Sequence, residues 1–335
     1  MSARHFLAAA LVAAATAGRS APAAAQYVDI RIHDPVAIQA GGRYYLFGTG
    51  QGIDVWSSTD LRSWTHEPPV FDSLPAWAKT VNPRTRGDAW APDISFHDGE
   101  YHLYYAVSTF GSNASAIGHA TNVTLDRKDP RFKWVDHGIV VRSVPGRDMW
   151  NAIDPNLAFD DAGTPWLVFG SFWSGMKLFK LAPDLNGPAQ PQEWHTVAAR
   201  NRYERLDERA AGDALSGAIE APFIFHKNGW YYLFVSWDAC CRGVQSTYKV
   251  VVGRSRSITG PYLDNAGQDM RLGGGTLVVR GDSAWAGVGH NSAYTFGGTD
   301  YLVFHGYARF DQGRPKLWVK KIDWDAEGWP HVTLN

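Results

Sequence analysis

Three acidic residues stand at matching places in a repeated pattern of this chain. Each precedes a proline by one or two residues and, 13 to 15 residues later, the centre of an aromatic-rich apolar segment follows. The acids are Asp34, Asp154 and Glu220, and the aromatic centres that follow them are Phe47, Phe169 and Phe234. Two further copies keep the spacing without the acid: Trp90 comes 14 residues before Tyr104, and His290 comes 14 residues before Phe304. A structural repeat explains five similar segments but not carboxylates in three of them, so we predict a functional site there.

Three carboxylates that converge can hydrolyse a glycosidic bond. A protonated carboxyl group gives its proton to the leaving oxygen, while an ionised one takes a proton from water or attacks directly. A third acid can orient the proton donor and raise its pKa through like-charge repulsion. A single Asp-Pro pair is more often a turn feature. Glu220 has little turn preference, however, and three acids in register favour chemistry.

The elements that must position these acids are short strands in a repeat of 56 to 70 residues. Each unit carries a Gly- or Asn-containing turn signal between its first strand and its aromatic strand, as expected of a β-hairpin. Third strands are expected at residues 53–57, 116–120, 176–181, 249–255 and 316–322. Five units of three or four strands with almost no helical periodicity predict an all-β, five-bladed β-propeller. The innermost strands of a propeller line its central channel, so acids spread over the sequence would meet at one end of it.

The first 25 residues have the layout of a secretory signal peptide. Two early basic residues precede an Ala-rich apolar run over 6–17 and a small-residue stretch over 21–25. The apolar run is too short for a membrane span of about 18 residues. We therefore expect cleavage after Ala25, secretion to an extracellular or periplasmic location, and one propeller catalytic domain over residues 26–335.

Charge and composition narrow the partners. Without the signal peptide the chain has 30 basic and 33 acidic residues, a net charge of −3. Binding to nucleic acid or an anionic membrane would need an excess of basic residues, so neither partner is expected. The 15 Trp, 14 Tyr and 16 Phe suit a core and also sugar-binding clefts. The two cysteines, Cys240 and Cys241, are adjacent, so they form either a local vicinal disulfide or two free thiols.

Taken together, the motifs resemble glycoside hydrolase family 43 and, within it, the endo-1,5-α-L-arabinanases. The resemblance spans nearly the whole mature chain and rests on the segments His33-Asp34-Pro35, Trp90-Ala91-Pro92-Asp93, Ile153-Asp154-Pro155-Asn156, Ile219-Glu220-Ala221-Pro222 and Gly289-His290-Asn291. It implies hydrolysis of plant arabinan with inversion at the anomeric carbon. Asp34 would be the general base, Glu220 the general acid, and Asp154 the residue that orients Glu220 and raises its pKa. An inverting enzyme holds its two carboxyl groups about 6.5–9.5 Å apart.

The resemblance also implies further site residues and one possible ion. His290 would help to hold a calcium ion, mostly through water, although calcium prefers oxygen ligands; the alternative is a histidine that only forms hydrogen bonds in the channel. No organic cofactor is expected, and the protein is expected to be a monomer. The residues expected to contact substrate are His33, Trp90, Phe110, Asn156, Ser171 and Trp173.

Two alternatives are open at this point. The same fold could carry an exo-acting α-L-arabinofuranosidase or a β-xylosidase, which release sugars from chain ends. A non-catalytic, lectin-like propeller that binds polysaccharide is less favoured, because it would make the three acids coincidental.

Overall fold

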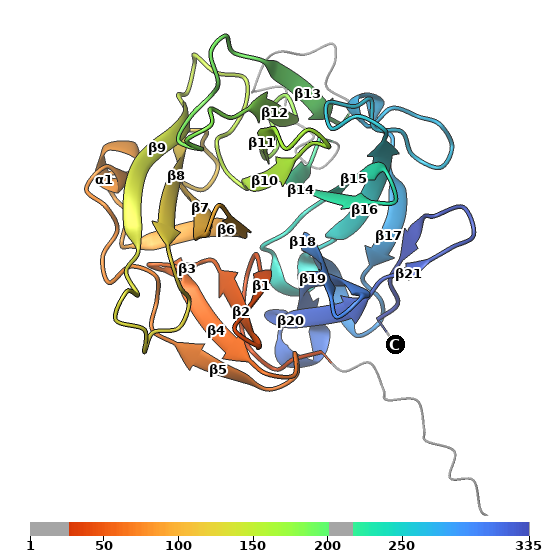
Figure 1. The fold of residues 1–335 in the computed structure, drawn as a ribbon. Coiled ribbons are helices and arrows are strands. Elements are labelled where there is room, and N and C mark those ends of the chain that lie inside the picture. The colour runs from red at the N-terminus through yellow and green to blue at the C-terminus, as the bar shows by residue number, and fades with distance from the viewer. Residues whose placement is uncertain (1–26, 201–216, 335) are drawn as a thin grey trace, which may run out of the picture.

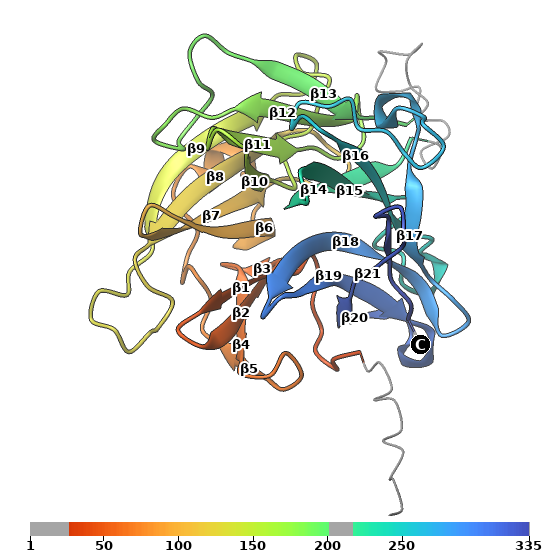
Figure 2. The ribbon, with the colours of Figure 1, turned by 45° about the vertical axis from the view of Figure 1, so that its right-hand side comes forward.

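The computed structural model describes residues 27–200 and 217–334, and these residues form five antiparallel blades arranged around a central axis (Figure 1). The predicted five-bladed β-propeller is therefore confirmed. The predicted signal peptide lies outside the described residues. In both views the first strand of each blade lies toward the centre, and β5, β9, β13 and β17 lie at the periphery (Figure 1, Figure 2).

The blades follow one another in chain order. Blade one contains β1 (Val36–Ala40), β2 (Arg43–Gly48), β4 (Asp54–Ser58) and β5 (Trp64–Glu67). Blade two contains β6 (Asp88–His97), β7 (Glu100–Val107), β8 (Ser115–Asn122) and β9 (Val135–Ser143), and the short β3 (Gly50–Gln51) pairs with β6. Blade three contains β10 (Asn156–Phe159), β11 (Pro165–Phe169), β12 (Met176–Lys180) and β13 (Trp194–Ala198).

The last two blades differ in their outer strands. Blade four contains β14 (Ile219–Lys227), β15 (Trp230–Trp237), β16 (Lys249–Ser255) and β17 (Thr276–Arg280). Blade five contains β18 (Trp285–Phe296), β19 (Thr299–Ala308) and β20 (Arg314–Lys321), and a small hairpin of β21 (Asp323–Trp324) and β22 (Pro330–His331) follows it. The five predicted third strands correspond to β4, β8, β12, β16 and β20.

Alternate side chains of one strand pack against two different neighbouring blades. In β15, Tyr232 and Phe234 belong to the core between blades four and five, whereas Tyr231, Leu233 and Val235 belong to the core between blades three and four. Successive side chains of a strand point to opposite faces, and a sheet buried on both faces needs apolar residues on both. This explains why the aromatic strands are continuous apolar runs.

A separate apolar cluster fills each interface between neighbouring blades of the described residues. The predicted aromatic centres Phe47, Tyr104, Phe169, Phe234 and Phe304 are all buried in these clusters. Burying one large apolar side chain contributes about 1.5–3 kcal/mol. The interfaces therefore hold the first strands in fixed positions around the channel.

The N-terminal segment closes the ring. The Val28 N–H donates to Leu317 O at 2.9 Å, and the Leu317 N–H donates to Ile30 O at 3.3 Å, so this segment lies beside β20 of blade five before the chain enters blade one. The N-terminal segment therefore joins the last blade.

Helical structure is confined to single turns. The described residues contain α1 (Ala78–Val81) and the 3₁₀ turns Gly243–Gln245, Met270–Leu272 and Arg309–Asp311. Within the described part of the chain, none of the helices has the length and apolar character needed to cross a membrane.

Candidate active site

The same backbone distortion lies within or just before the first strand of every blade. One residue adopts a left-handed conformation there, with φ between 42° and 57°, and we call this the turn position. The residues at the turn position are Asp34, Ala91, Asp154, Ala221 and His290. A left-handed residue other than glycine costs about 1–2 kcal/mol, and such strain is typical of functional sites.

The turn position corrects the sequence alignment of the repeats by one residue in two blades. Trp90 and Glu220 had been aligned with Asp34, but the residues that match Asp34 in conformation are Ala91 and Ala221. Trp90 pairs with Ala106 and Glu220 pairs with Ser236, each across its own hairpin, and a register shift follows each pair. Glu220 therefore occupies the place just before the turn position, which His33 occupies in blade one.

Asp34 is held as a carboxylate by two neighbours. Its Oδ2 accepts a hydrogen bond from Thr49, and its Oδ1 lies 3.0 Å from Nδ1 of His290. Burial acts to raise the pKa of Asp34, but the charge and hydrogen bond of His290 outweigh it and hold that pKa well below its usual range. The same contacts raise the pKa of His290 to about 9 against the effect of its own burial. At neutral pH the pair is a carboxylate and an imidazolium.

Glu220 lies in the opposite kind of environment. It is buried, and burial raises its pKa even though Tyr248 donates to Oε1 at 2.8 Å and Ser171 donates to Oε2 at 2.8 Å. Those two hydroxyl groups fix the carboxyl group in place from both sides. A raised pKa favours the protonated form of a carboxyl group, which can act as a proton donor.

Asp154 fixes the backbone beside Glu220. Its Oδ2 accepts the N–H of Ala221 at 3.1 Å. Burial raises the pKa of Asp154, and the nearby charge of Glu220 raises it further. The two carboxyl groups therefore titrate as a coupled pair, and ionisation of one disfavours ionisation of the other.

The residues around His290 do not form a calcium-ligand set by themselves. Calcium prefers six to eight oxygen ligands, whereas His290 brings nitrogen, and its Nδ1 is already in contact with Asp34. His33, Asp34 and His305 bring ligand-type atoms within 4.8 Å of one another. Two imidazoles and one carboxylate suit a transition metal better than calcium, and Nδ1 of His305 already accepts the Asp34 N–H at 3.2 Å. A calcium ion held mostly through water stays a prediction, and no catalytic step is derived through it.

Four of the residues predicted to contact substrate lie at the same end of the propeller as the acids. His33 packs on the rings of His305 and Tyr307, at 4.5 and 5.6 Å between ring centroids. Trp90 is half-buried against the core between blades two and three. Phe110 lies on the segment that follows β7 and is 78% exposed, and Trp173 is half-buried in the segment after β11. An exposed aromatic ring beside a channel of acids suits stacking on a sugar.

The other two predicted contact residues are engaged by the protein. The Asn156 amide donates to Asp93 Oδ1 at 3.1 Å and accepts from the Ile224 N–H at 2.9 Å, so it links blades two, three and four. Asp93 is a buried acid whose pKa burial raises to about 6. Ser171, by contrast, is in the site, because its hydroxyl group positions Glu220.

Several residues of the site carry no signal in the acid pattern. Thr49 follows β2 and joins Asp34 to blade two, since its hydroxyl oxygen accepts the Ala91 N–H at 2.8 Å. Tyr248 stands just before β16, and the Ser236 hydroxyl oxygen accepts the His290 N–H at 2.9 Å. Thr49, Ser236 and Tyr248 each lie at or next to the end of the second or third strand of a blade. That position is the one feature that could have identified them.

A vicinal disulfide borders the site. Cys240 and Cys241 are joined, as one of the two sequence alternatives expected. The Cys241 N–H donates to the hydroxyl oxygen of Tyr307 at 2.8 Å, and that hydroxyl group lies 3.1 Å from Nε2 of His305. Because Nδ1 of His305 accepts the Asp34 N–H, the disulfide loop is connected to Asp34 through two side chains.

One low-pKa and two high-pKa carboxyl groups at one end of a five-bladed propeller suit a glycoside hydrolase. The comparisons with known proteins agree. The family model of glycosyl hydrolases family 43 matches residues 28–330, and the chain belongs to that family.

Individual relatives share most of their length with this chain. It is 52% identical to an extracellular exo-α-(1→5)-L-arabinofuranosidase of Cellvibrio japonicus, over 90% of this chain and 86% of the relative. It is 41% identical to an extracellular endo-α-(1→5)-L-arabinanase of Bacillus subtilis, over 97% and 96%. A solved structure of the Cellvibrio cellulosa α-L-arabinanase complexed with arabinohexaose superposes with a TM-score of 0.88 at 51% identity, covering 91% of this chain and 96% of that one.

Proposed function

We propose that this glycoside hydrolase cleaves α-1,5-linked L-arabinan with inversion at the anomeric carbon. The observation that carries the proposal is that the surroundings of two carboxyl groups in one channel move their pKa values in opposite directions. The pKa of Asp34 is held below its usual range by His290, and the pKa of Glu220 is raised by burial. One base and one acid available at the same pH are what hydrolysis of a glycosidic bond requires.

The three acids take different roles in this proposal. Asp34, ionised, removes a proton from the attacking water. Glu220, protonated, gives its proton to the leaving sugar oxygen, and Tyr248 and Ser171 hold it in orientation. Asp154 orients Glu220 through the Ala221 N–H and, when it is ionised, disfavours ionisation of Glu220 by like-charge repulsion. We expect a separation of about 6.5–9.5 Å between the carboxyl groups of Asp34 and Glu220 in the substrate complex, which leaves room for the water.

The substrate is proposed from the relatives. Two of them are named for action on α-(1→5)-linked arabinan, and a third was solved with arabinohexaose. The exposed ring of Phe110 and the half-buried Trp90 are suited to stacking against arabinose units entering the channel. His33 and Trp173 complete the set that we expect to touch substrate.

The mode of cleavage has two candidates. The sequence pattern predicts internal cleavage, and the 41% identical relative is named an endo enzyme. The 52% identical relative is named an exo enzyme, and this higher identity favours release of products from chain ends. The products from linear arabinan separate the two: an early ladder of oligosaccharides supports internal cleavage, and a single short product from the outset supports the exo mode.

Variants of the two principal acids test the mechanism. Glu220→Gln and Asp34→Asn should fold and bind arabinohexaose but lose hydrolysis by several orders of magnitude. The anomer released first by the unmodified enzyme, followed by proton NMR, should be the inverted one. Full activity in either variant, or a retained anomer, would contradict the proposed roles.

We further propose that the protein is secreted as a monomer after cleavage at Ala25. The relatives at 52% and 41% identity are named extracellular. Mass spectrometry of protein from the culture medium should find an N-terminus at Gln26, and light scattering should give the mass of one chain.

A further inference from the structure

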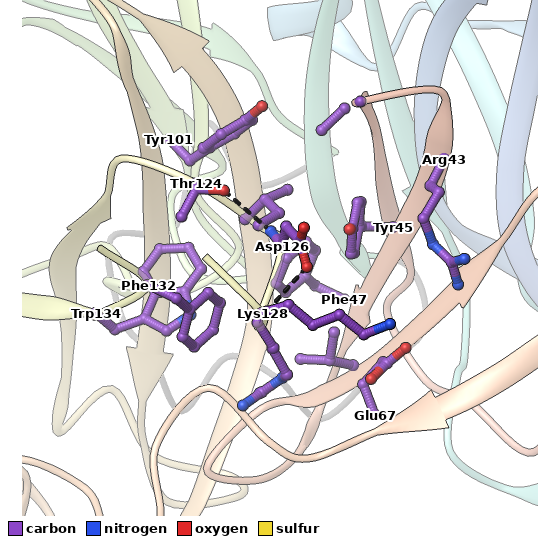
Figure 3. Close-up of a pocket in the computed structure, with 15 residues that line it drawn as sticks. Arg43, Tyr45, Phe47, Glu67, Tyr101, Thr124, Asp126, Lys128, Phe132 and Trp134 are labelled. Carbon is purple, nitrogen blue, oxygen red and sulfur yellow. Dashed lines mark hydrogen bonds between the residues drawn. The ribbon is translucent and has the colours of Figure 1, made fainter. Parts of the chain in front are cut away.

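A second cavity lies between blades one and two, away from the carboxylates. Its volume is about 460 Å³ (Figure 3). It opens beside the β1–β2 hairpin, which includes Gly41 and lies at the end of β1 opposite to Asp34. Residues of the segment 124–134 form the other side of the cavity. This segment follows the end of β8 that is farthest from the catalytic residues. The cavity is therefore separate from the channel.

Aromatic rings form much of the cavity wall. Tyr45 and Phe47 come from β2, Tyr101 comes from β7, and Phe132 and Trp134 come from the segment between β8 and β9. Figure 3 shows Phe132 and Trp134 on one side and Tyr45 on the other, with Lys128 extended between them. Rings that combine an apolar face with a polar tip are common where a ligand has both apolar and polar surfaces.

Two of these rings carry hydroxyl groups without a protein partner. Within the described residues, the hydroxyl groups of Tyr45 and Tyr101 make no hydrogen bond. Burial raises the pKa of both tyrosines, so both hydroxyl groups stay protonated. Each can donate and accept a hydrogen bond. Both are available to a ligand at no cost in existing contacts.

The charged groups of the rim carry both signs, with three cations and two carboxylates. The Arg43 guanidinium donates to the Ser57 hydroxyl oxygen at 2.7 Å, and that hydroxyl donates to Glu67 at 2.6 Å, so these side chains are held together. Asp126 and Lys128 then add one charge of each sign. Arg127 adds a further positive charge, but its guanidinium donates to the carbonyl oxygens of Pro68 and Pro69. An acidic ligand would need several cations free of protein partners, whereas a mixed set of donors and acceptors suits neutral hydroxyl groups.

We propose that this cavity binds a short neutral oligosaccharide, a segment of the same polysaccharide that the channel cleaves. A volume of about 460 Å³ lies within the usual range for small-molecule sites, about 300–1,000 Å³. The identity of the sugar rests on the function proposed above, and the existence of the site rests on the cavity itself.

A remote binding site has a specific kinetic consequence. A long chain can engage the cavity and the channel together, so binding at one raises the effective concentration at the other. A short oligosaccharide cannot span both. Loss of the cavity should therefore raise KM for long arabinan and leave kcat/KM for arabinohexaose unchanged.

The test uses calorimetric titration of the full chain carrying Glu220→Gln, which prevents turnover, with arabinohexaose. The parent should show two binding sites. Adding Tyr45→Phe and Tyr101→Phe should weaken one site about tenfold, since two neutral hydrogen bonds are lost, and should leave the melting temperature unchanged because neither hydroxyl has a protein partner. Tyr44→Phe is the matched control: it lies on the same strand but packs against Phe296 on the other face of the sheet.

The outcomes separate this inference from the proposed function. A chain that hydrolyses arabinan but titrates with one site, or with two sites that the Tyr45 and Tyr101 changes leave intact, overturns the inference alone. Binding of trigalacturonate at the cavity in preference to arabinohexaose overturns the neutral assignment. No hydrolysis of arabinan overturns both the proposed function and the sugar named here.

Discussion

Replacing Tyr248 by phenylalanine should move the alkaline limb of the pH–rate profile to higher pH. Tyr248 is buried and donates one of the two hydroxyl hydrogen bonds to Glu220, at 2.8 Å. Such a bond favours the ionised carboxylate and so lowers its pKa. Removing the donor disfavours ionisation, so Glu220 keeps its proton to a higher pH. Because the acid must be protonated to work, activity should persist further into the alkaline range.

The size of the shift follows from the strength of one hydrogen bond. A hydrogen bond to a charged group contributes roughly 1.5–3 kcal/mol, and one pKa unit corresponds to about 1.4 kcal/mol. The protonated form also loses a partner, so the lower end applies and we expect an upward shift of about one unit in the alkaline pKa. Ser171→Ala removes the other donor, to Oε2, and should shift the limb in the same direction.

The assay is kcat/KM for arabinohexaose over the acid and alkaline range, since this profile reports the free enzyme. Tyr262→Phe is the control, because its hydroxyl group donates to Ile258 O in the core between blades three and four and does not touch Glu220. An alkaline limb that stays in place, or moves to lower pH, in the Tyr248 variant would refute the role of Glu220 as the protonated acid.

Three further changes test other parts of the site. Asp154→Asn removes an acid beside Glu220 whose pKa burial raises to about 8, so the alkaline limb should become less steep, because one group fewer loses a proton there, and kcat should fall; an alkaline limb of unchanged steepness contradicts the coupling of Asp154 to Glu220. His290→Gln removes the imidazolium that holds the pKa of Asp34 low, so the acid limb should rise toward the ordinary aspartate value of about 4, and an acid limb that does not rise rejects the ion pair. Ala91→Gly relieves a left-handed alanine with φ of 42° and should raise stability to unfolding by about 0.5–1 kcal/mol after the entropy cost of glycine; a loss of stability in urea titration counts against the strained turn position.

The fold could be predicted because its main signals are local. Each aromatic strand is a continuous apolar run followed or preceded by a turn, and a sheet buried on both faces requires such runs. Phe234 and Phe304 are the centres of two such runs, and both are fully buried. The closure of the ring was not predictable, because the bond between Val28 and Leu317 joins the two ends of the sequence and has no local pattern.

The alignment of the repeats was predictable only in part. The positions of the acids and of Trp90 align Glu220 with Asp34. The prolines carried the correct alignment: Pro35, Pro155 and Pro222 each follow a turn position directly. The donors to the acids were beyond prediction, because a threonine or tyrosine at a strand end is common and becomes functional only through the pairing of strands.

The one-residue difference explains how a single blade geometry supplies two kinds of carboxyl group. Asp34 and His290 both occupy the turn position, in blades one and five, and blade five lies next to blade one in the closed ring. Their side chains meet at 3.0 Å, and the contact keeps the carboxylate ionised. Glu220 occupies the place before the turn position, so its carboxyl group lies among the hydroxyl groups of Tyr248 and Ser171.

In that place, burial rather than a cation determines the pKa of Glu220. If the glutamate stood at the turn position of blade four and alanine stood before it, the carboxyl group would no longer lie among these hydroxyl groups. The Glu220→Ala, Ala221→Glu double variant should therefore keep all carboxyl groups in the channel and still lose hydrolysis. Retained activity in that variant would mean that the number of acids matters and their two positions do not.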